Sequence, residues 1–220
     1  PDVPDHVLYD GKVARRAVET IRKLAAKPNQ PWFLAVGFIK PHTPFIAPKK
    51  YWDLYDPEKI QLADWQQFPD GAPGVAGHGS HEIRRYTDQP KNGEFTEANQ
   101  RKLKHAYYAC VSYIDAQIGR VLNELKRQGL DDNTIVVLWS DHGYHLGEQG
   151  LWGKTTNYEL DTRVALIVRA PGAKANGQPS RALVELVDLY PTLADFAGLP
   201  LPDHLEGTSL RPLLDKPDRP

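Results

Sequence analysis

The pattern of apolar and polar positions predicts three helices. Over residues 12–27, and again over residues 96–128, apolar side chains recur every three or four positions, with charged residues between them. Thr96 is a suitable N-cap for the second helix, and Gly129 lies just beyond its end. A third amphipathic helix is expected over residues 182–197, with Pro191 inside it.

Three apolar runs have the composition of buried strands: Trp32–Phe38, Ile135–Trp139 and Val164–Val168. β-branched and aromatic residues are frequent in them, which is typical of strands covered on both faces. Because these runs alternate with the expected helices, they predict an α/β fold: one largely parallel sheet covered by helices on both faces. Residues 46–95 are rich in proline, glycine and aromatic residues, and we expect a long irregular loop that is ordered over a site.

Polar residues follow two of these strands. Asp141 and His142 come directly after the run that ends at Trp139, and His42 comes shortly after Phe38. In open α/β sheets, ligands bind at the carboxyl ends of the strands, so these side chains are expected to share one edge.

A carboxylate next to a neutral imidazole suits a divalent cation, which makes Asp141 and His142 candidate metal ligands. Lys154 follows in a loop that contains glycine and tryptophan, and this loop could return its ammonium group to the same edge. A cation, a carboxylate and a lysine together would suit a tetrahedral oxyanion such as sulfate or phosphate. The alternative is a surface Asp-His pair with an unrelated lysine.

Composition narrows the function classes. Lys and Arg number 27 against 28 Asp and Glu, so no global field attracts nucleic acid, and no apolar run is long enough to span a membrane. The single cysteine, Cys110, falls on the apolar stripe of the second helix, where a buried structural thiol is expected rather than a nucleophile. The chain starts at Pro1 and contains no Met, so we expect its native N-terminus to be missing.

Several segments of the chain stand out as motifs, in this order: KPHTPF at 40–45, SDHG at 140–143 with LGE at 146–148, WGK at 152–154, VELVDLYPTL at 184–193 and GTSLRPLL at 207–214. Taken together and in order, they resemble type I sulfatases, and within them the iduronate-2-sulfatase-like group. The resemblance runs from the first helix to the end of the chain.

The resemblance implies a sulfuric-ester hydrolase of the alkaline-phosphatase-like fold, which uses one Ca²⁺ ion and a formylglycine made from a cysteine. By motif match, Asp141 and His142 would be calcium ligands. Lys154 would contact the sulfate and stabilise charge on its oxygens. His42 would lie against the leaving-group oxygen, as a hydrogen-bond donor or general acid.

Three residues that lie close in the sequence to these candidates are further candidates for substrate binding. Tyr144 and His145 could line a sugar pocket, although ordinary loop packing explains them equally well. Lys40 could support the site or be a solvated lysine. The implied partner is a sulfated carbohydrate such as a glycosaminoglycan, and the implied location is the bacterial periplasm or the exterior of the cell.

The chain departs from the family pattern at the nucleophile. It contains no C-x-P-S-R or C-x-A-S-R motif, and the paired aspartates that complete the calcium shell are absent. We therefore expect residues 1–220 to be part of one catalytic domain, with the formylglycine segment and a small C-terminal subdomain outside this chain. Two alternatives stay open: a phosphodiesterase or phosphomutase of the same superfamily, and a non-catalytic sugar-binding relative.

Overall fold

The computed structural model describes residues 1–219, which divide into two compact units. The first unit comprises residues 1–131 and 140–164, and the second comprises residues 132–139 and those from 165 onward. The first unit contains the helices α1 (Tyr9–Ala25), α2 (Lys49–Trp52), α3 (His81–Arg84), α4 (Glu97–Arg127) and α5 (Glu159–Thr162), with the short strands β2 (His145–Leu146) and β3 (Trp152–Gly153). The second contains β1 (Val136–Trp139), β4 (Leu166–Arg169), α6 (Leu189–Phe196) and α7 (Arg211–Asp215).

The longest helix, α4, begins and ends where the sequence predicts. At its start the Thr96 hydroxyl accepts a hydrogen bond from the backbone N–H of Asn99 at 3.3 Å. Past its end Gly129 has a φ of +66°, and the N–H of Leu130 donates to the carbonyl of Leu125 at 3.1 Å. This closure is common at helix C-termini, and it favours glycine because other residues are strained at positive φ.

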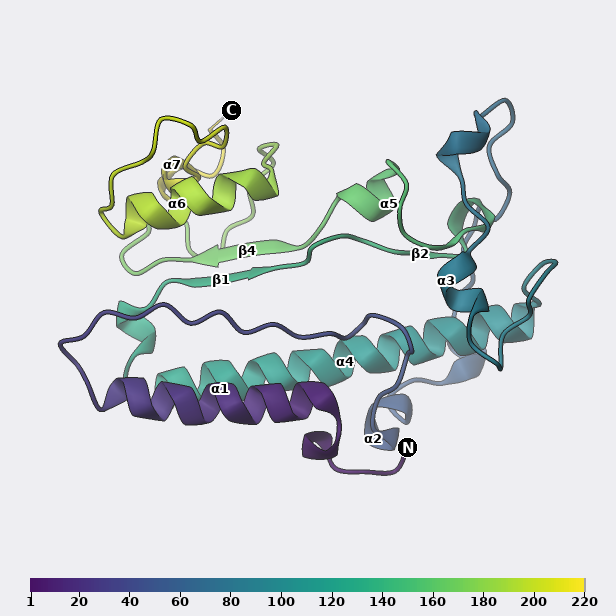
Figure 1. Ribbon diagram of the computed structural model, residues 1–220, viewed down its shortest axis with the longest axis horizontal. Helices are drawn as coiled ribbons and strands as arrows, with labels where there is room; N and C mark the ends of the chain where they lie inside the picture. Colours follow the sequence, from purple (N-terminus) through teal and green to yellow (C-terminus); the bar gives the residue numbers. More distant parts are fainter. Residues whose placement is uncertain (220) are drawn as a thin grey trace. The chain divides into compact units, whose positions relative to one another are not determined.

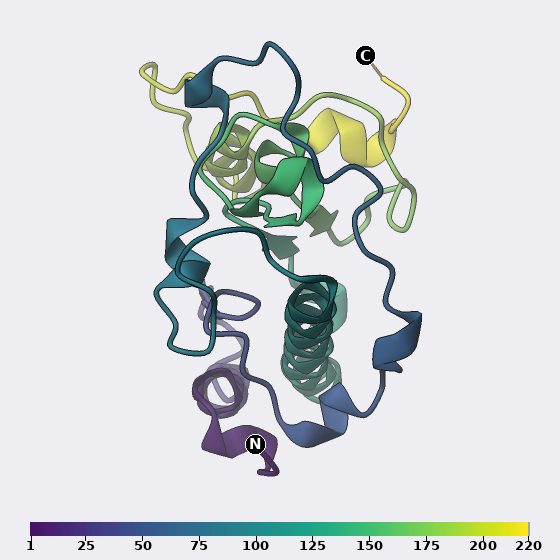
Figure 2. The ribbon, with the colours of Figure 1, turned by 90° about the vertical axis from the view of Figure 1, so that its right-hand side faces the viewer.

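Helix α1 lies alongside α4, as both views of the ribbon show (Figures 1 and 2). Its inner face is made of small or aliphatic side chains, Ala14, Ala17 and Ile21, which are all buried. The Arg22 guanidinium donates to the fully buried carboxylate of Glu124 on α4, with Nε to Oε1 at 2.9 Å. The expectation of two long amphipathic helices is confirmed.

Two apolar clusters make the core of the first unit. Cys110 belongs to the first cluster, together with Ala47, Tyr51, Ala109 and Tyr113, and burial raises the pKa of its thiol to about 12. The expected burial of the Cys110 thiol is confirmed, and a buried thiol of raised pKa is not the setting of a nucleophile. The second cluster joins segments that are distant in the sequence: Ile83 of α3, Phe95, Leu103 of α4 and Trp152 of β3.

The strand pairing differs from the predicted parallel sheet. β1 and β4 pair antiparallel, with Val136 opposite Arg169 and Trp139 opposite Leu166, and they form a two-stranded sheet. β2 and β3 form a second antiparallel pair. The prediction that Ile135–Trp139 is buried on both faces is also wrong, because Trp139 is 50% exposed.

Trp32–Phe38 is apolar but forms no strand in this structure. Its side chains alternate between exposed and half-buried, and Phe33 is 80% exposed. The segment has strand-like composition, yet a strand needs a neighbour to accept its backbone hydrogen bonds. Among residues 1–219 no other segment forms a ladder with it.

Residues 46–95 are less uniform than the predicted loop. Besides α2 and α3 they contain two short 3₁₀ helices, Pro57–Lys59 and Gly74–Ala76. In the second unit, the helix predicted over residues 182–197 is shorter, because α6 begins only at Leu189. Pro191 is its third residue, and proline is tolerated in a first turn, where its missing N–H has no helical partner to bind.

Candidate active site

The turn that carries His42 is held by a buried carboxylate of α1. Asp10 is 1% exposed, and its two oxygens accept the backbone N–H groups of Ile39 at 2.8 Å and Lys40 at 3.1 Å. The Lys40 ammonium donates to the carbonyls of His42 and Pro44, both at 2.7 Å. Burial lowers the pKa of Lys40, although Cys110 and Asp10 oppose that shift. Lys40 therefore braces the turn from within.

Both ring nitrogens of His42 face oxygen acceptors. Nδ1 lies 2.7 Å from the carbonyl oxygen of Thr43, and Nε2 lies 3.2 Å from Oε1 of Glu82. A neutral imidazole can donate from only one nitrogen, whereas a protonated ring donates from both. This pair of contacts is therefore the one that an imidazolium satisfies.

Lys154 reaches the same carboxylate from another element. Its Nζ lies 3.2 Å from Oε2 of Glu82, and Glu82 Oε1 also accepts a hydrogen bond from the Thr43 hydroxyl at 2.8 Å. Burial raises the pKa of Glu82, but the hydrogen bonds from Thr43 and Lys154 and the nearby His42 outweigh it and lower the pKa overall. The structure thus brings His42 and Lys154, 112 positions apart in the sequence, to one carboxylate.

The short β2–β3 pair positions Lys154. Trp152 and Gly153 of β3 lie opposite Leu146 and His145 of β2. Trp152 is 2% exposed, and its backbone N–H donates to the Ser80 hydroxyl at 2.9 Å, directly before α3. The elements that carry Glu82 and Lys154 are therefore joined by a buried hydrogen bond as well as by apolar packing.

The metal candidates Asp141 and His142 are arranged more openly. The Asp141 side chain is 83% exposed and accepts the backbone N–H of His142 at 3.0 Å. His142 Nε2 lies 3.8 Å from Asp141 Oδ2, and its Nδ1 lies 2.7 Å from the carbonyl of Gly143. Within residues 1–219 no group of three or more His, Cys, Asp or Glu side chains could hold a metal ion.

These two donors suit part of a Ca²⁺ shell, because a carboxylate is a hard oxygen ligand. Calcium takes 6–8 ligands, however, so the described residues do not complete a site for it.

A buried pair, His145 and Asp161, holds the Asp141–Gly143 loop in place. His145 is fully buried, and its Nδ1 lies 2.9 Å from Asp161 Oδ1. The other oxygen of Asp161 accepts the N–H and hydroxyl of Thr156, at 2.9 and 2.6 Å. The Asp161 backbone carbonyl accepts the N–H of Gly143 at 2.8 Å, and a Cβ on Gly143 would lie 1.9 Å from the carbonyl oxygen of Leu160. Only glycine fits there.

Tyr144 packs in an aromatic cluster with Phe45 and Tyr107, at ring-centroid distances of 5.8 and 6.0 Å. Burial, with a smaller contribution from the charge of Glu82, raises the pKa of its phenol. Its hydroxyl is buried and has no hydrogen-bond partner among the described residues. In this conformation Tyr144 and His145 are both packed inward, so direct contact with a sugar stays a prediction.

Sequence reasoning missed three residues that the geometry makes prominent: Glu82, Thr43 and Asp161. Glu82 lies in the aperiodic stretch 46–95, where no spacing rule connects it to His42 or Lys154. Thr43 is a neighbour of His42, and that adjacency was the one available signal. Asp161 lies in the four-residue helix α5, too short to give a periodic pattern.

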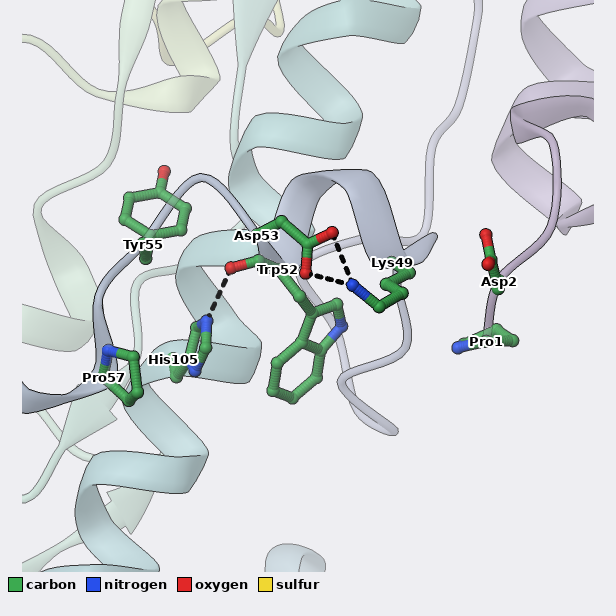
Figure 3. A pocket seen from close by; sticks show the side chains of 8 residues that line it. All are labelled: Pro1, Asp2, Lys49, Trp52, Asp53, Tyr55, Pro57 and His105. Carbon is green, nitrogen blue, oxygen red and sulfur yellow. Dashed lines mark hydrogen bonds and ion pairs between the residues drawn. The ribbon is translucent and has the colours of Figure 1, made fainter.

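A pocket of about 470 Å³ lies elsewhere in the first unit and contains none of the candidate residues. Figure 3 shows its polar groups bound to one another: Lys49 pairs with Asp53 at 2.6 Å, and the His105 ring lies 2.8 Å from the carbonyl of Trp52. Its remaining lining residues are Pro1, Asp2, Tyr55 and Pro57.

Comparison with known proteins identifies the family. A sulfatase family model matches residues 2–199. The chain belongs to the sulfatase family. It is 39% identical to mouse iduronate 2-sulfatase over 91% of its length, and 33% identical to a choline-sulfatase of Rhizobium meliloti over 99%. It spans 42% and 43% of those two relatives, so it corresponds to less than half of each.

Solved structures agree with this assignment. A phosphonate monoester hydrolase from Silicibacter pomeroyi matches 99% of this chain with a TM-score of 0.82 and 31% identity, and the chain covers 43% of it. A protein solved with its substrate D-glucosamine-2-N,6-O-disulfate matches 94% with a TM-score of 0.79 at 23% identity, with 52% of that chain covered, and supports the fold. The expected alkaline-phosphatase-like sulfatase fold is therefore confirmed, although the predicted parallel strand pairing is not observed.

Among residues 1–219, no helix combines the length and the apolarity that a bilayer crossing requires.

Proposed function

We propose that the full-length protein hydrolyses sulfate esters, with His42 as the acid at the leaving group and Lys154 as the cation on the sulfate. The observation that carries this proposal is the approach of both side chains to a single anion, each at 3.2 Å from the Glu82 carboxylate. Groups that meet on one carboxylate are close enough to contact one sulfate ester.

The two side chains suit different parts of the reaction. When the S–O bond to the sugar breaks, negative charge develops on the bridging oxygen, and the Nε2 proton of a His42 imidazolium can pass to that oxygen. The Lys154 ammonium is a compact charge that suits a non-bridging sulfate oxygen throughout. Breakage of the bond therefore releases a neutral hydroxyl rather than an alkoxide.

The cofactors are those that the family implies. A hydrated formylglycine would supply the nucleophile that attacks sulfur, and we propose that its cysteine lies in a part of the protein outside these 220 residues. Asp141 and His142 would contribute two of the calcium ligands, and the Asp161–His145 pair would hold their loop in place.

For the substrate we propose a sulfated carbohydrate of the glycosaminoglycan type. The support is the similarity to two iduronate 2-sulfatases, from mouse and human, at 39% and 38% identity. We further propose that Tyr144 lies near the bound sugar and that Lys40 stabilises the turn that carries His42. We also propose that the protein is periplasmic or secreted. Cell fractionation tests the location.

A second candidate activity is hydrolysis of phosphonate monoesters or phosphodiesters. It is favoured by the similarity to the phosphonate monoester hydrolase, which has a TM-score of 0.82. The sulfatase reading is preferred because the curated relatives in the comparison include sulfatases at 38–39% identity over 91% of this chain.

A substrate panel separates these proposals. The purified full-length protein would be assayed with nitrophenyl sulfate, a sulfated disaccharide and phenyl phosphonate monoesters, alongside its Lys154→Ala variant. Sulfate release that depends on Lys154 is the expected result. Turnover of the phosphonate alone, or sulfate release unchanged by Lys154→Ala, would contradict the sulfatase proposal.

A further inference from the structure

The Glu82 carboxylate lies between the two groups to which we assign the chemistry. Its Oε1 lies 3.2 Å from His42 Nε2 and accepts the Thr43 hydroxyl at 2.8 Å, while its Oε2 lies 3.2 Å from Lys154 Nζ. Each oxygen therefore faces its own basic side chain. Neither the family match nor the sequence motifs assign a role to this residue.

The surroundings fix Glu82 independently of His42 and Lys154. Its neighbour Ile83 is 2% exposed and packs with Phe95, Leu103 and Trp152. Ser80, directly before α3, accepts the backbone N–H of Trp152 at 2.9 Å. The carboxylate is thus presented from a buried anchor rather than from a solvated loop.

We propose that Glu82 is a positioning residue of the sulfate site, whose carboxylate aims the His42 ring and keeps it protonated while holding Lys154 beside it. The inference rests on the proposed sulfatase function and deepens it. With Nδ1 bound to the Thr43 carbonyl and Nε2 facing the Glu82 carboxylate, a ring that donates to both acceptors is protonated. When the ester binds, its bridging oxygen replaces Glu82 Oε1 as the acceptor of the Nε2 proton, and that proton passes to it as the S–O bond breaks.

The other charged side chains in this region are bound to other partners, so Glu82 is the counter-ion of His42. The Lys40 ammonium is bound to the carbonyls of His42 and Pro44, at 2.7 Å each. Arg84, on the same helix as Glu82, donates to the carbonyls of Gly79, Pro90 and Gly93, at 3.1, 2.9 and 2.7 Å. Burial and, to a smaller extent, the charge of Glu82 raise the pKa of the Tyr144 phenol, so Tyr144 stays neutral.

The test compares Glu82→Gln and Glu82→Asp with Glu94→Gln in the full-length protein. Glu94 is exposed in the same irregular stretch and serves as the matched control. Turnover would be measured on a sugar sulfate, whose leaving group needs a proton, and on nitrophenyl sulfate, which needs little protonation. The protonated fraction of the His42 ring would be followed by ¹⁵N NMR between pH 5 and 8, which requires no activity.

Loss of the carboxylate charge should act through His42. Glu82→Gln is expected to lower kcat on the sugar sulfate by about tenfold or more and on nitrophenyl sulfate by less than about threefold, because a positioned acid contributes most where the leaving group is poor. The His42 ring should lose its proton at lower pH. Glu82→Asp should retain more activity than Glu82→Gln, and Glu94→Gln should resemble the wild type.

Two results would overturn the inference: equal losses on both substrates with Glu82→Gln, or an unchanged protonated fraction of His42. If Glu82→Gln does not fold, the same kinetics and NMR titration, carried out on Glu82→Asp and the wild type, still test the role of Glu82. If the wild type releases no sulfate at all, the proposed function fails, while the NMR measurement still tests the Glu82–His42 coupling by itself.

Discussion

Two parts of the candidate site in the first unit, the group around Glu82 and the Asp141–Gly143 loop, differ in how many contacts hold their side chains in place. Around Glu82, the side chain of Lys154 is 19% exposed, and His42 and Thr43 complete a set of mutual contacts. In the Asp141–Gly143 loop, the Asp141 side chain is 83% exposed and its nearest partner is the backbone of its own neighbour. The groups that we propose bind the sulfate are preorganised within this chain, whereas Asp141 and His142, the proposed metal ligands, would need further ligands.

This difference indicates which substitutions should reduce activity and which should affect only the binding of a ligand. A preorganised group loses function when its partner is removed, because the partner holds its geometry and charge. Substitution of an exposed carboxylate changes the stability of the protein little, and its effect appears only when a ligand binds there. The His145–Asp161 pair contacts the Asp141–Gly143 loop, and its burial makes it the most sensitive position for stability.

The largest effect is expected at that pair. Asp161→Ala removes the acceptor of a fully buried histidine and of Thr156, and each buried donor left unsatisfied typically costs about 1–3 kcal/mol. Thermal or urea unfolding of the full-length protein would measure this loss. A change below about 1 kcal/mol would show that the loop tolerates an unpaired His145 and would remove the pair from the argument.

The next effect concerns the preorganised part. His42→Ala and Lys154→Ala should each lower turnover of a sugar sulfate by about 100-fold or more, the range for a positioned acid or oxyanion donor. On nitrophenyl sulfate the loss for His42→Ala should shrink, while that for Lys154→Ala should stay. Steady-state kinetics on both substrates measures this. Identical profiles for the two variants would break the assignment of separate roles.

A smaller effect is expected at the open part. Asp141→Ala should weaken Ca²⁺ binding by the full-length protein about tenfold or more, since it removes a carboxylate ligand, with little change in melting temperature without calcium. Calorimetric titration with Ca²⁺ measures the affinity, with Asp132→Ala, another exposed aspartate, as control. Unchanged affinity would exclude Asp141 from the metal site.

The smallest effect is the pH dependence of stability at Glu82. Its pKa in the folded protein is lowered below the ordinary value of 4.5, so its contribution is present above that value and is lost as the pH falls toward the folded-state pKa. The difference in unfolding free energy between wild type and Glu82→Gln, below about 1 kcal/mol for a partly exposed pair, should therefore shrink from pH 6 to pH 3. A difference that grows on acidification would contradict this sign.

Local patterns in the sequence were sufficient for several features. The periodicity of residues 96–128, with Thr96 and Gly129 at the ends, predicted α4 to within one residue of each observed bound, because helix hydrogen bonds and caps are local. The same stripe placed Cys110 in the core. The ordered motifs around His42, Asp141 and Lys154 indicated the sulfatase family before any geometry was known.

The tertiary structure alone decided which segments meet. Strand composition in Trp32–Phe38 could not supply a pairing partner, and the orientation of β1 depends on β4, about thirty residues later in the chain. The position of Glu82 between His42 and Lys154 likewise depends on the packing of Ile83 against Trp152. Such contacts arise from long-range burial of apolar surface, which fixes neighbours in space that no spacing in the sequence records.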